Sequence, residues 1–544
     1  MILTFLILLL VSNGLTVRPD TSILYSRIGI IIMIYGIISS YTNLYMYSFQ
    51  GGFSLYGGLL NITSITVVFQ ILILLISGII LLLTSFYPRK RFIDNPGNIL
   101  NTFSRKKEYS ILINKSSDQF TIVEYTLIII FAVSGGTLLL CCSDLGSIYL
   151  CIELQSFSLY ILSCMHRNSE SSTGSALTYF LLGGLSSCFI LLGIGLIYAN
   201  SGLTNLDDIY TISCNSSKYL SYSTWYVHNY LLYSLLLISV GLLFKIAAAP
   251  FHWWSPDVYD GVPTIVTTFI AILGKIAILI LFLELVHYTS TLITSTLEFY
   301  SWDIGMSISC LMSLVIGTIL GLTQTRIKRL LAYSTISHIG FILMTLIVHT
   351  IESYQAFMFY VIQYTFTNLN VFFILIFIGY TLYFYYTDVS EYNNLPEKNN
   401  SPIQLVSQLK GYFSINPILA LCLVITMFSF AGLPPLIGFF AKQMVLTTSL
   451  DNNKVVLVLI GVITSVIGAV YYLTVIKTVY FDNSDYKKLD ISNIDMKISL
   501  VSIFAIFFSI INIIVFIFIL IPEEILNLCN MLAIVNFTLD GVNN

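Results

Sequence analysis

Residues 242–257 have the sequence LLFKIAAAPFHWWSPD, an apolar run that contains a lysine and then a proline. Proline lacks an N–H and clashes with the carbonyl four residues earlier, so Pro250 breaks a helix just after Lys245. Inside a membrane, a broken helix beside a charged side chain is tolerated only where other protein segments or a hydrated cavity surround it. This stretch therefore predicts a discontinuous transmembrane helix in the interior of a bundle.

The composition of the whole chain also indicates a membrane protein. Of the 544 residues, 57% are hydrophobic and 9% are charged, and the mean hydropathy is +0.88. Soluble domains carry roughly 25% charged residues, so the composition excludes a large soluble multidomain enzyme. The formal net charge of −3 argues against nucleic acid as a partner, because a nucleic-acid-binding protein needs a strongly basic face.

Apolar segments of about 20 residues, the length that crosses a bilayer, recur along the chain. Backbone polar groups in lipid must be bonded within their own segment, so we expect helices and not strands. The predicted spans are 2–13, 24–46, 57–87, 121–140, 147–165, 174–199, 230–250, 262–288, 303–323, 331–350, 355–386, 414–449, 456–481 and 497–521. The predicted fold class is an all-α polytopic membrane protein with about 14 transmembrane helices, in a single membrane domain (1–544).

The distribution of basic residues predicts the orientation of these spans. If the spans alternate in direction, the basic loop residues gather on one face of the bilayer, because the opposite loops carry only Arg18, Lys218 and Lys454. The basic face includes the clusters Arg89-Lys90-Arg91, Arg105-Lys106-Lys107 and Arg326 to Arg329. Basic loops mark the inner side of a membrane, so the N-terminus is expected on the outer face.

A second broken helix is predicted in the span 414–449, where Gly432-Leu433-Pro434-Pro435 precedes Lys442. Spans four to eight and spans nine to thirteen each contain one broken helix as their fourth member. Because five spans are an odd number, the second unit enters the membrane inverted relative to the first. The sequence therefore predicts two inverted five-helix repeats, each with a discontinuous helix, an arrangement that points to a transport site.

The predicted boundaries within the membrane domain follow from this count. They are three N-terminal helices (1–90), a first inverted repeat (121–288), a second inverted repeat (303–481), and a C-terminal helix and tail (482–544).

Three lysines lie too deep in their spans to reach the interface: Lys245, Lys275 and Lys442. A lysine at the centre of a span costs roughly 2.5–3.5 kcal/mol, so each needs a compensating partner. Glu153 is the buried acidic residue available; Glu124, close to an interface, and Glu284 also lie in or near spans. Buried groups of this kind pair with one another and mark ion or proton paths. A proline kink that serves packing alone remains the alternative for one broken helix, but two such breaks, each beside a lysine, favour transport.

Two histidines are candidates for the same path. His338 lies in the tenth span with Ser334 and Ser337 nearby, and His252 follows the first break. Histidine titrates near pH 6.5, which suits a proton relay, although a purely structural role remains open for both. The nine cysteines form no C-x-x-C pair, so we interpret them as small buried hydrophobic residues and expect neither a metal site nor a cofactor in this chain.

Three stretches of the chain resemble the antiporter-like subunits of the proton-pumping NADH:ubiquinone oxidoreductase, complex I. They are ELQSFSLY (153–160), APFHWWSPDVYDGVPT (249–264), and RLLAYS (329–334) together with AGLPP (431–435) and the following residues to Lys442. The resemblance covers about residues 20–520, and the stretch around Pro256 is the most specific of the three.

The resemblance implies a role for each matching residue. Glu153 and Lys245 would form an ion pair that controls proton binding, Lys275 would be the central relay, and Lys442 would exchange protons with the far side. Burial disfavours a charged lysine and a nearby carboxylate favours it, so making or breaking the pair can switch Lys245 between holding and releasing a proton.

The resemblance also implies the setting in which the chain works. FMN, iron–sulfur clusters and ubiquinone would be held by partner subunits, and the neighbours would be other antiporter-like membrane subunits and lipids, cardiolipin among them. The abundance of Phe (37) and Tyr (36) favours an organellar gene, hence a multi-pass protein of the mitochondrial inner membrane with its N-terminus on the intermembrane-space side. Two alternatives remain open: a cation/proton antiporter subunit of the same fold, and a structural scaffold subunit without transport.

Overall fold

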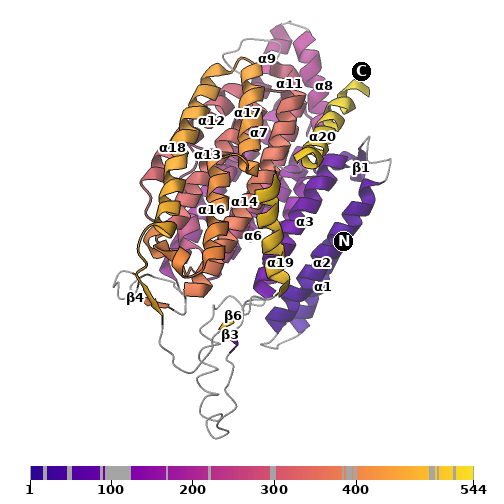
Figure 1. Cartoon of the computed structure of the whole chain (residues 1–544). Helices are drawn as coiled ribbons and strands as arrows, with labels where there is room; N and C mark the ends of the chain where they lie inside the picture. The colour runs from indigo at the N-terminus through magenta and orange to yellow at the C-terminus, as the bar shows by residue number, and fades with distance from the viewer. Residues whose placement is uncertain are drawn as a thin grey trace.

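The structure is a computed structural model in which most of the chain forms helices. It describes residues 2–15, 21–45, 52–85, 90–91, 124–166, 169–218, 222–293, 302–382, 385–387, 392, 395, 401–488, 497–498, 502–518 and 522–542. The described helices lie side by side as one bundle (Figure 1).

The helices follow one another along the chain. Most connections between them are short, and longer segments separate α2 from α3, α3 from α5, α14 from α16 and α18 from α19. They are α1 (Ile2–Leu15), α2 (Thr21–Leu44), α3 (Ser64–Ser85), α5 (Glu124–Leu139), α6 (Leu145–Cys164), α7 (Glu170–Ser201), α8 (Leu206–Lys218), α9 (Tyr222–Ile246), α10 (Trp254–Gly261), α11 (Thr264–Ile293), α12 (Trp302–Leu322), α13 (Ile327–Leu346), α14 (Ile351–Leu382), α16 (Pro417–Ala431), α17 (Ile437–Asp451), α18 (Val455–Tyr480), α19 (Ser502–Ile517) and α20 (Pro522–Val542). Three 3₁₀ turns, η2 (Tyr56–Gly58), η5 (Val406–Leu409) and η6 (Tyr412–Ser414), complete the described helical segments.

Each of the fourteen predicted spans contains a helix of the structure. Among the described residues, nine helices are long and apolar enough to cross a membrane, and five shorter apolar helices account for the remaining spans. The predicted all-α polytopic fold is therefore confirmed. Three helices lie outside the predicted spans, namely α8, α10 and α20, because each contains charged residues that interrupt its apolar pattern.

Short antiparallel strand pairs connect the ends of the helices. They are β1 (Phe53–Leu55) with β2 (Leu60–Ile62), β3 (Lys90–Arg91) with β6 (Lys497–Ile498), and β4 (Tyr385–Thr387) with β5 (Tyr486–Lys488). The first pair occupies the start of the predicted span 57–87, so its helix begins only at Ser64. Strands β3, β4 and β6 lie at the lower end of the bundle in Figure 1, so the polar segments that contain them share one end, as alternating spans require.

Two inverted five-helix repeats form the main body of the bundle, and each contains one discontinuous helix. In the first half, α9 and α10 are separated by residues 247–253, and in the second half, α16 and α17 are separated by residues 432–436. Each break contains a cis peptide bond, at Ala249-Pro250 and at Pro434-Pro435. The sequence expectation of paired broken helices is confirmed.

The helix before each break ends in the same hydrogen-bond pattern. After α9, Ala248 N donates to Leu243 O at 3.0 Å and Ala247, with φ +61°, donates to Phe244 O at 3.2 Å. After α16, the corresponding pair of hydrogen bonds surrounds Gly432, whose φ is +83°. This is the Schellman motif, which needs a left-handed residue directly after the helix.

Close packing between the helices fixes the position of α9. A Cβ atom at Gly193 of α7 would lie 2.8 Å from Ser234 O of α9, and a Cβ atom at Gly241 of α9 would lie 2.8 Å from Ser186 O of α7. Small residues on both sides let the two backbones touch, which is how helices associate tightly in lipid. The last turn of α9, which carries Lys245, is therefore held against α7.

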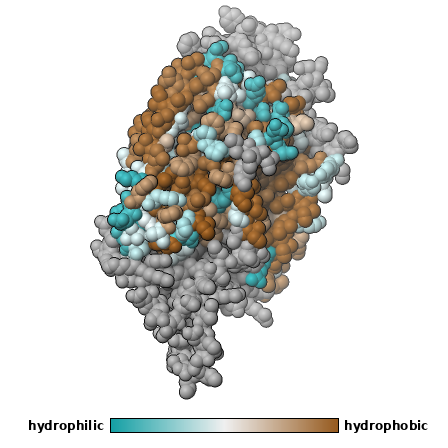
Figure 2. Space-filling view, in the orientation of Figure 1, coloured by the Kyte–Doolittle hydropathy of each residue, from teal (hydrophilic) through white to brown (hydrophobic). Residues whose placement is uncertain are grey.

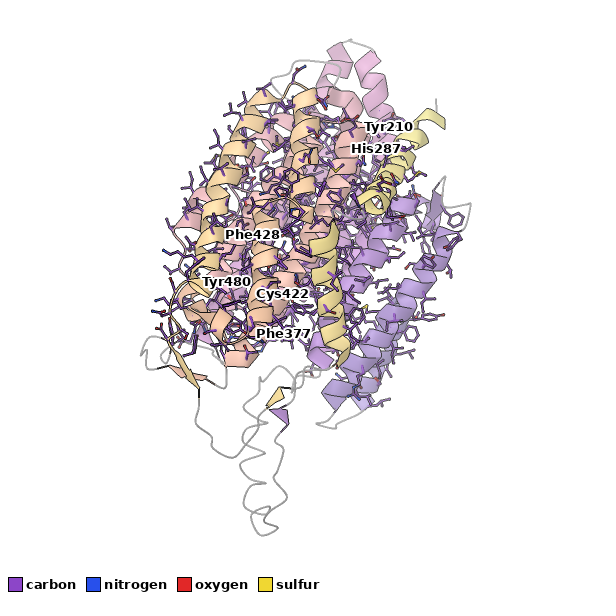
Figure 3. All side chains as sticks on the ribbon, viewed as in Figure 1. Tyr210, His287, Phe377, Cys422, Phe428 and Tyr480 are labelled. Atoms are coloured by element: carbon purple, nitrogen blue, oxygen red, sulfur yellow. The ribbon has the colours of Figure 1, made fainter. Side chains whose placement is uncertain are left out.

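Side chains fill the spaces between the ribbons, as Figure 3 shows. Its labels place His287 of α11 toward the upper end of the bundle and Phe377 of α14 and Tyr480 of α18 toward the lower end. The first residues of α11, which directly follow α10, therefore lie toward the lower end. Helices α11, α13 and α14 are the most completely buried, with almost every described side chain inside the bundle.

The outer surface is hydrophobic over a broad area. In Figure 2 hydrophobic residues cover most of the coloured part of the visible face, and hydrophilic residues gather mainly near its upper end and its lower left edge. Exposed Leu, Ile and Val side chains on α7, α12 and α18, such as Leu181, Ile319 and Val466, contribute to outward-facing surface of this kind. An apolar surface of this extent is typical of a protein that lies in lipid.

Candidate functional site

Lys245 lies in the last turn of α9, just before the first break, and contacts α6. Its ammonium nitrogen is 3.4 Å from Glu153 Oε1 and 3.3 Å from Tyr160 Oη. The side chains of Lys245 and Glu153 are 6% and 15% exposed. Glu153 and Tyr160 are seven residues apart on α6, which places them on one face of the helix. The predicted partners therefore lie together in a mostly buried site.

Lys275 lies in the middle of α11 and is fully buried. Its ammonium group donates to Thr335 Oγ1 of α13 at 3.2 Å and lies 5.5 Å from the centre of the Tyr259 ring of α10. Within the described ranges, no ion pair joins Lys275 to a carboxylate. A hydroxyl group and an aromatic face stabilise a cation less than a carboxylate does, so the partners of Lys275 in the described structure differ in kind from the carboxylate that Lys245 contacts.

Lys442 lies in the second turn of α17, after the second break. Its ammonium group donates to Phe430 O at 2.9 Å and to Ala431 O at 3.0 Å, both at the end of α16. These carbonyls have no partner within their own helix, and the end of a helix favours a cation. A Cβ atom at Gly432 would lie 2.8 Å from Lys442 Cδ, so the absence of a side chain there lets the lysine reach the carbonyls.

His338 lies on α13 between two tyrosines. Its Nδ1 is 2.8 Å from Tyr360 Oη of α14, and its Nε2 is 3.4 Å from Tyr472 Oη of α18. The imidazole ring is also 5.2 Å from the ring of Phe430, the residue whose carbonyl accepts from Lys442. The nearby hydroxyls of Ser334 and Ser337 donate to carbonyls of their own helix.

His252 lies in the first break and is buried. Its ring neighbours in the described structure are Trp253, at 5.5 Å between ring centres, and Tyr333, at 6.3 Å. Over the described ranges, no hydrogen bond or ion pair joins His252 to any of the three lysines or to Glu153. The structure therefore brings five of the six candidate residues into one series of helices and leaves His252 to one side.

The arrangement forms a series of ionisable and hydroxyl groups on adjacent helices. It begins with the Glu153–Lys245 pair, continues with Lys275 and Thr335, and reaches His338 and Lys442 through α13 and α16. Hydroxyl and imidazole groups both donate and accept hydrogen bonds, so they can pass protons between amines. Chemically, such a series can take up a proton at one amine and release it at another.

Four uncharged partners of the candidate residues were missed by sequence reasoning: Tyr160, Thr335, Tyr360 and Tyr472. Only Tyr160 carried a usable signal, because its spacing from Glu153 places both on one helix face. Tyrosine is abundant in this chain, with 36 copies, so the other contacts become visible only once α13, α14 and α18 are placed.

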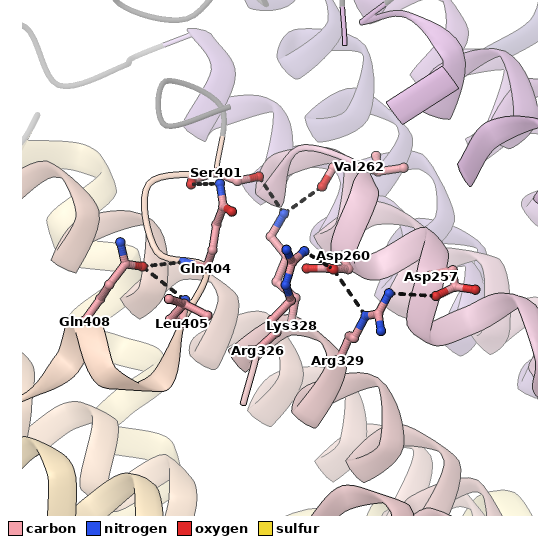
Figure 4. A network of polar contacts seen from close by, with 10 residues as sticks. All are labelled: Asp257, Asp260, Val262, Arg326, Lys328, Arg329, Ser401, Gln404, Leu405 and Gln408. Carbon is pink, nitrogen blue, oxygen red and sulfur yellow. Dashed lines mark hydrogen bonds and ion pairs between the residues drawn. The ribbon is translucent and has the colours of Figure 1, made fainter. Parts of the chain in front are cut away.

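A polar network links α10 to the start of α13 (Figure 4). Lys328, which the sequence places in a basic surface loop, is instead 1% exposed and donates to Val262 O at 2.7 Å and to Ser401 Oγ at 2.6 Å. The surface assignment fails because the segment that contains Ser401 folds over the start of α13. Arg326 and Arg329, in contrast, remain partly exposed and pair with acidic residues of α10.

The described cysteines are free thiols in differing environments. Five are buried, Cys151 is partly buried, and Cys164 and Cys188 are exposed. The interpretation of all cysteines as buried is therefore wrong for Cys164 and Cys188, which lie on outward faces of their helices; the side chain of Cys214 lies outside the described residues. Across the described ranges, no group of three or more His, Cys, Asp or Glu side chains is arranged to hold a metal ion.

Comparisons with known proteins point to the membrane subunits of NADH:quinone oxidoreductases and Mrp antiporters. A family model described as "NADH:quinone oxidoreductase/Mrp antiporter, TM" matches residues 142–468. The NADH-ubiquinone oxidoreductase chain 2 of Rhizopus oryzae is 45% identical over 461 residues, which cover 85% of this chain and 82% of the relative.

Solved structures share the fold over nearly the whole length. A chain of respiratory complex I from Thermus thermophilus aligns with a TM-score of 0.69 at 22% identity, covering 97% of this chain and 99% of that one. A chain of the Mrp complex from Dietzia sp. aligns with a TM-score of 0.70 at 15% identity, covering 98% and 96%.

Proposed function

The chain belongs to the family of NADH:quinone oxidoreductase and Mrp antiporter membrane subunits, and from this premise we propose that it fills the place of subunit 2 in respiratory complex I. It is a proton-translocating subunit of the membrane arm of NADH:ubiquinone oxidoreductase, and redox chemistry in other subunits drives it. The observation that supports this function most strongly is the buried Glu153–Lys245 pair, at 3.4 Å, beside a broken helix.

We propose that protons move along Glu153, Lys245, Lys275, His338 and Lys442. Lys245 holds its proton while Glu153 is near and releases it when the pair opens, because desolvation then disfavours the ammonium form. Moving one charge against about 200 mV requires roughly 4–5 kcal/mol, and making or breaking a buried ion pair changes energies on that scale. We propose that His252 contacts water at the first break, since its Nδ1 atom is buried and has no hydrogen-bond partner in the described structure.

The proposal assigns no cofactor to this chain. FMN, the iron–sulfur clusters and ubiquinone belong to partner subunits, as the family resemblance implies. The partners are other membrane subunits of complex I, including neighbouring antiporter-like subunits. The apolar faces of the outer helices contact these subunits and lipid, and anionic lipids such as cardiolipin contact the basic end that contains Arg326 and Arg329, whose side chains are 39% and 40% exposed.

The setting is a mitochondrial inner membrane, which the chain crosses many times. We propose that the end with the basic loops faces the matrix, which leaves the N-terminus on the intermembrane-space side. The chain then forms one membrane domain with three N-terminal helices (1–90), a first repeat (121–288), a second repeat (303–481) and a C-terminal part (482–544).

The test removes both charges of the pair at once, so that neither is left buried alone. Complex I carrying Glu153→Gln and Lys245→Met should assemble, and its quinone reduction and proton pumping should fall severely. The matched control, Asp303→Asn with His349→Gln, removes an ion pair of 3.2 Å that, among the described residues, shares no hydrogen bond or ion pair with the relay residues, and it should pump normally.

The same experiment separates the alternatives. A structural scaffold would support full pumping in the Glu153→Gln, Lys245→Met variant, and that result would refute the relay. A cation/proton antiporter subunit would show a flux that depends on sodium, which is measured by replacing sodium with potassium in the assay. We expect no change in proton pumping on that replacement.

A further inference from the structure

The short helix α10 contacts the surroundings of Lys245 through its first residue. Trp254 Nε1 donates to Phe244 O, one residue before Lys245, at 2.9 Å. The Trp254 ring stacks on Tyr179 of α7 at 4.6 Å, and Tyr179 meets the edge of the Tyr160 ring at 4.7 Å. Because Tyr160 accepts from Lys245, a continuous series of contacts joins the ion pair to the start of α10.

The middle of α10 contacts the second lysine, and its last residue is fixed on α7. Tyr259 lies with its ring 5.5 Å from the ammonium group of Lys275. A Cβ atom at Gly261 would lie 2.7 Å from both Ser171 O and Ser175 Oγ, so the backbone of α10 touches α7 at this end. In the described structure no hydrogen bond joins Lys245 to Lys275. Helix α10 contacts the surroundings of both, as does α6, whose Gln155 Nε2 donates to Leu273 O at 3.0 Å.

Two acidic residues of α10 hold the start of α13. Asp260 Oδ2 accepts from Arg326 Nη1 and, at 3.2 Å, from Arg329 Nε, while Asp257 Oδ1 accepts from Arg329 Nη2 at 2.9 Å (Figure 4). The Asp260 side chain is 7% exposed. A mostly buried carboxylate that accepts from two guanidinium groups makes charge-assisted hydrogen bonds, which are the strong ones. We call these four residues the α10–α13 clamp.

The start of α13 is also joined to the segment that leads to the second broken helix. Lys328 donates both to Val262 O, just after α10, and to Ser401 Oγ. The backbone adds a hydrogen bond of 2.9 Å from Ile327 N to Gln404 O. The clamp therefore lies where the first repeat, α13 and the segment before α16 meet.

We propose that Asp260 is a positioning residue for proton translocation, because the α10–α13 clamp makes α10 and α13 move as one body. A change at the Glu153–Lys245 pair then reaches Lys275 through Tyr259, and it reaches Thr335 and His338 through α13. Rigid elements joined by ion pairs carry coupling between sites in this way. This inference rests on the proposed function and adds the connection between its two halves.

The test compares Asp260→Asn with Asp260→Glu in the assembled complex. The amide keeps the shape of the carboxylate but loses its charge, so the clamp loosens. We expect quinone-coupled NADH oxidation per assembled complex to fall about tenfold, since small misplacements of reacting groups cost rates on this scale. Electron transfer to an artificial acceptor should stay unchanged. Asp260→Glu should recover much of the coupled rate.

A second readout separates positioning from stability alone. If the clamp aligns the relay, proton transfer limits the rate in Asp260→Asn, and the slowing of the coupled reaction in D2O should exceed that of the parent complex. A residue that only stabilises the fold would lower the amount of assembled complex but leave the rate per complex and the D2O effect unchanged. That result would overturn the inference. Asp303→Asn, which loses an ion pair away from the clamp, serves as the control and should leave both readouts unchanged.

If the complex that carries Asp260→Asn does not assemble, Arg329→Gln provides a second test of the clamp. It removes the contacts of Arg329 with both acids and leaves Arg326 on Asp260, so a smaller loss of about threefold is expected, and an unchanged rate with an unchanged D2O effect overturns the inference. If the clamp variants pump normally while the Glu153→Gln, Lys245→Met variant does not, only this inference fails. If all of these variants pump normally, the proposed function fails as well.

Discussion

The two broken helices stabilise their buried lysines in different ways. In the first, Lys245 precedes the break and contacts a carboxylate of another helix, Glu153, at 3.4 Å. In the second, Lys442 follows the break and donates to two backbone carbonyls, Phe430 O and Ala431 O, at 2.9 and 3.0 Å. A side-chain partner moves with its own helix, whereas carbonyls at the end of a helix are fixed by the backbone.

This difference indicates which of the two lysines is better suited to alternate between binding and releasing a proton. The stabilisation of Lys245 depends on the distance between α6 and α9, so a small shift of either helix changes its affinity for a proton. The stabilisation of Lys442 stays nearly constant as long as α16 and α17 keep their break. We therefore expect the first break to respond to partner subunits and the second to act as a fixed proton site.

The largest expected effect on stability is that of Lys245→Met, which breaks the ion pair at the first break. Lys245→Met leaves Glu153 buried without its partner, and breaking a buried pair in this way costs about 3–5 kcal/mol of folding free energy. The Glu153→Gln, Lys245→Met variant should recover most of that loss. Thermal unfolding of the purified complex measures both. If the single and the combined variant were equally stable, Glu153 and Lys245 would not form a pair.

Lys442→Met should lower the free energy of unfolding less than Lys245→Met does. In the described structure Lys442 forms no ion pair, so its removal leaves no carboxylate without a partner. The net loss is about 2–3 kcal/mol, because two hydrogen bonds from a charged donor disappear while the desolvation cost of the buried ammonium group disappears with them. Proton pumping should be lost nevertheless. Thermal unfolding and pumping are measured on the same preparation. A loss of stability as large as that of Lys245→Met would contradict the distinction between the two breaks.

The sequence predicted the breaks better than their contacts. Pro250 and the Gly432 to Pro435 stretch act through local rules, since proline removes an N–H and glycine favours a left-handed backbone. The apolar runs are equally local, which is why each predicted span contains a helix. Helix α20 was missed because Glu523 and Glu524 open it, and charges in the first turn of a helix resemble a polar tail when only hydropathy is considered.

Contacts between distant segments could not be predicted, because they depend on how the helices are arranged. The charge rule that assigned Arg326, Lys328 and Arg329 to a surface loop holds for the two partly exposed arginines and fails for Lys328, which a later segment covers. Glu153 and Lys245 were identified because a charge in an apolar span is conspicuous. Tyr360 and Tyr472 carry no charge and lie among many other tyrosines, so nothing in the sequence distinguishes them.

Substitutions of the two residues with a left-handed backbone, Gly432 and Ala247, should change stability less and in opposite directions. Gly432→Ala should lower stability by about 1–2 kcal/mol, the cost of a left-handed conformation for a residue with a Cβ, and the new methyl group would also displace Lys442 Cδ, 2.8 Å away. Ala247→Gly removes the same strain at the first break and should gain up to about 1 kcal/mol, less the added freedom of the unfolded chain. Thermal unfolding measures both, and effects of the same sign would contradict the assignment.

The smallest expected effect concerns Phe244 O at the end of α9, which accepts from Ala247 N at 3.2 Å and also from a side chain. Phe244 O accepts from Trp254 Nε1 at 2.9 Å, a neutral donor, whereas the second break uses the charged Lys442 for the same purpose. Trp254→Phe keeps an aromatic ring against Tyr179 and removes only that donor, so stability should fall by about 1 kcal/mol. Proton pumping should decrease less than in Lys442→Met, since the neutral donor takes no part in proton transfer. Tyr233→Phe, an exposed aromatic position on α9, is the control. A complete loss of pumping in Trp254→Phe, with the complex assembled, would show that the donor at the first break does more than satisfy a carbonyl.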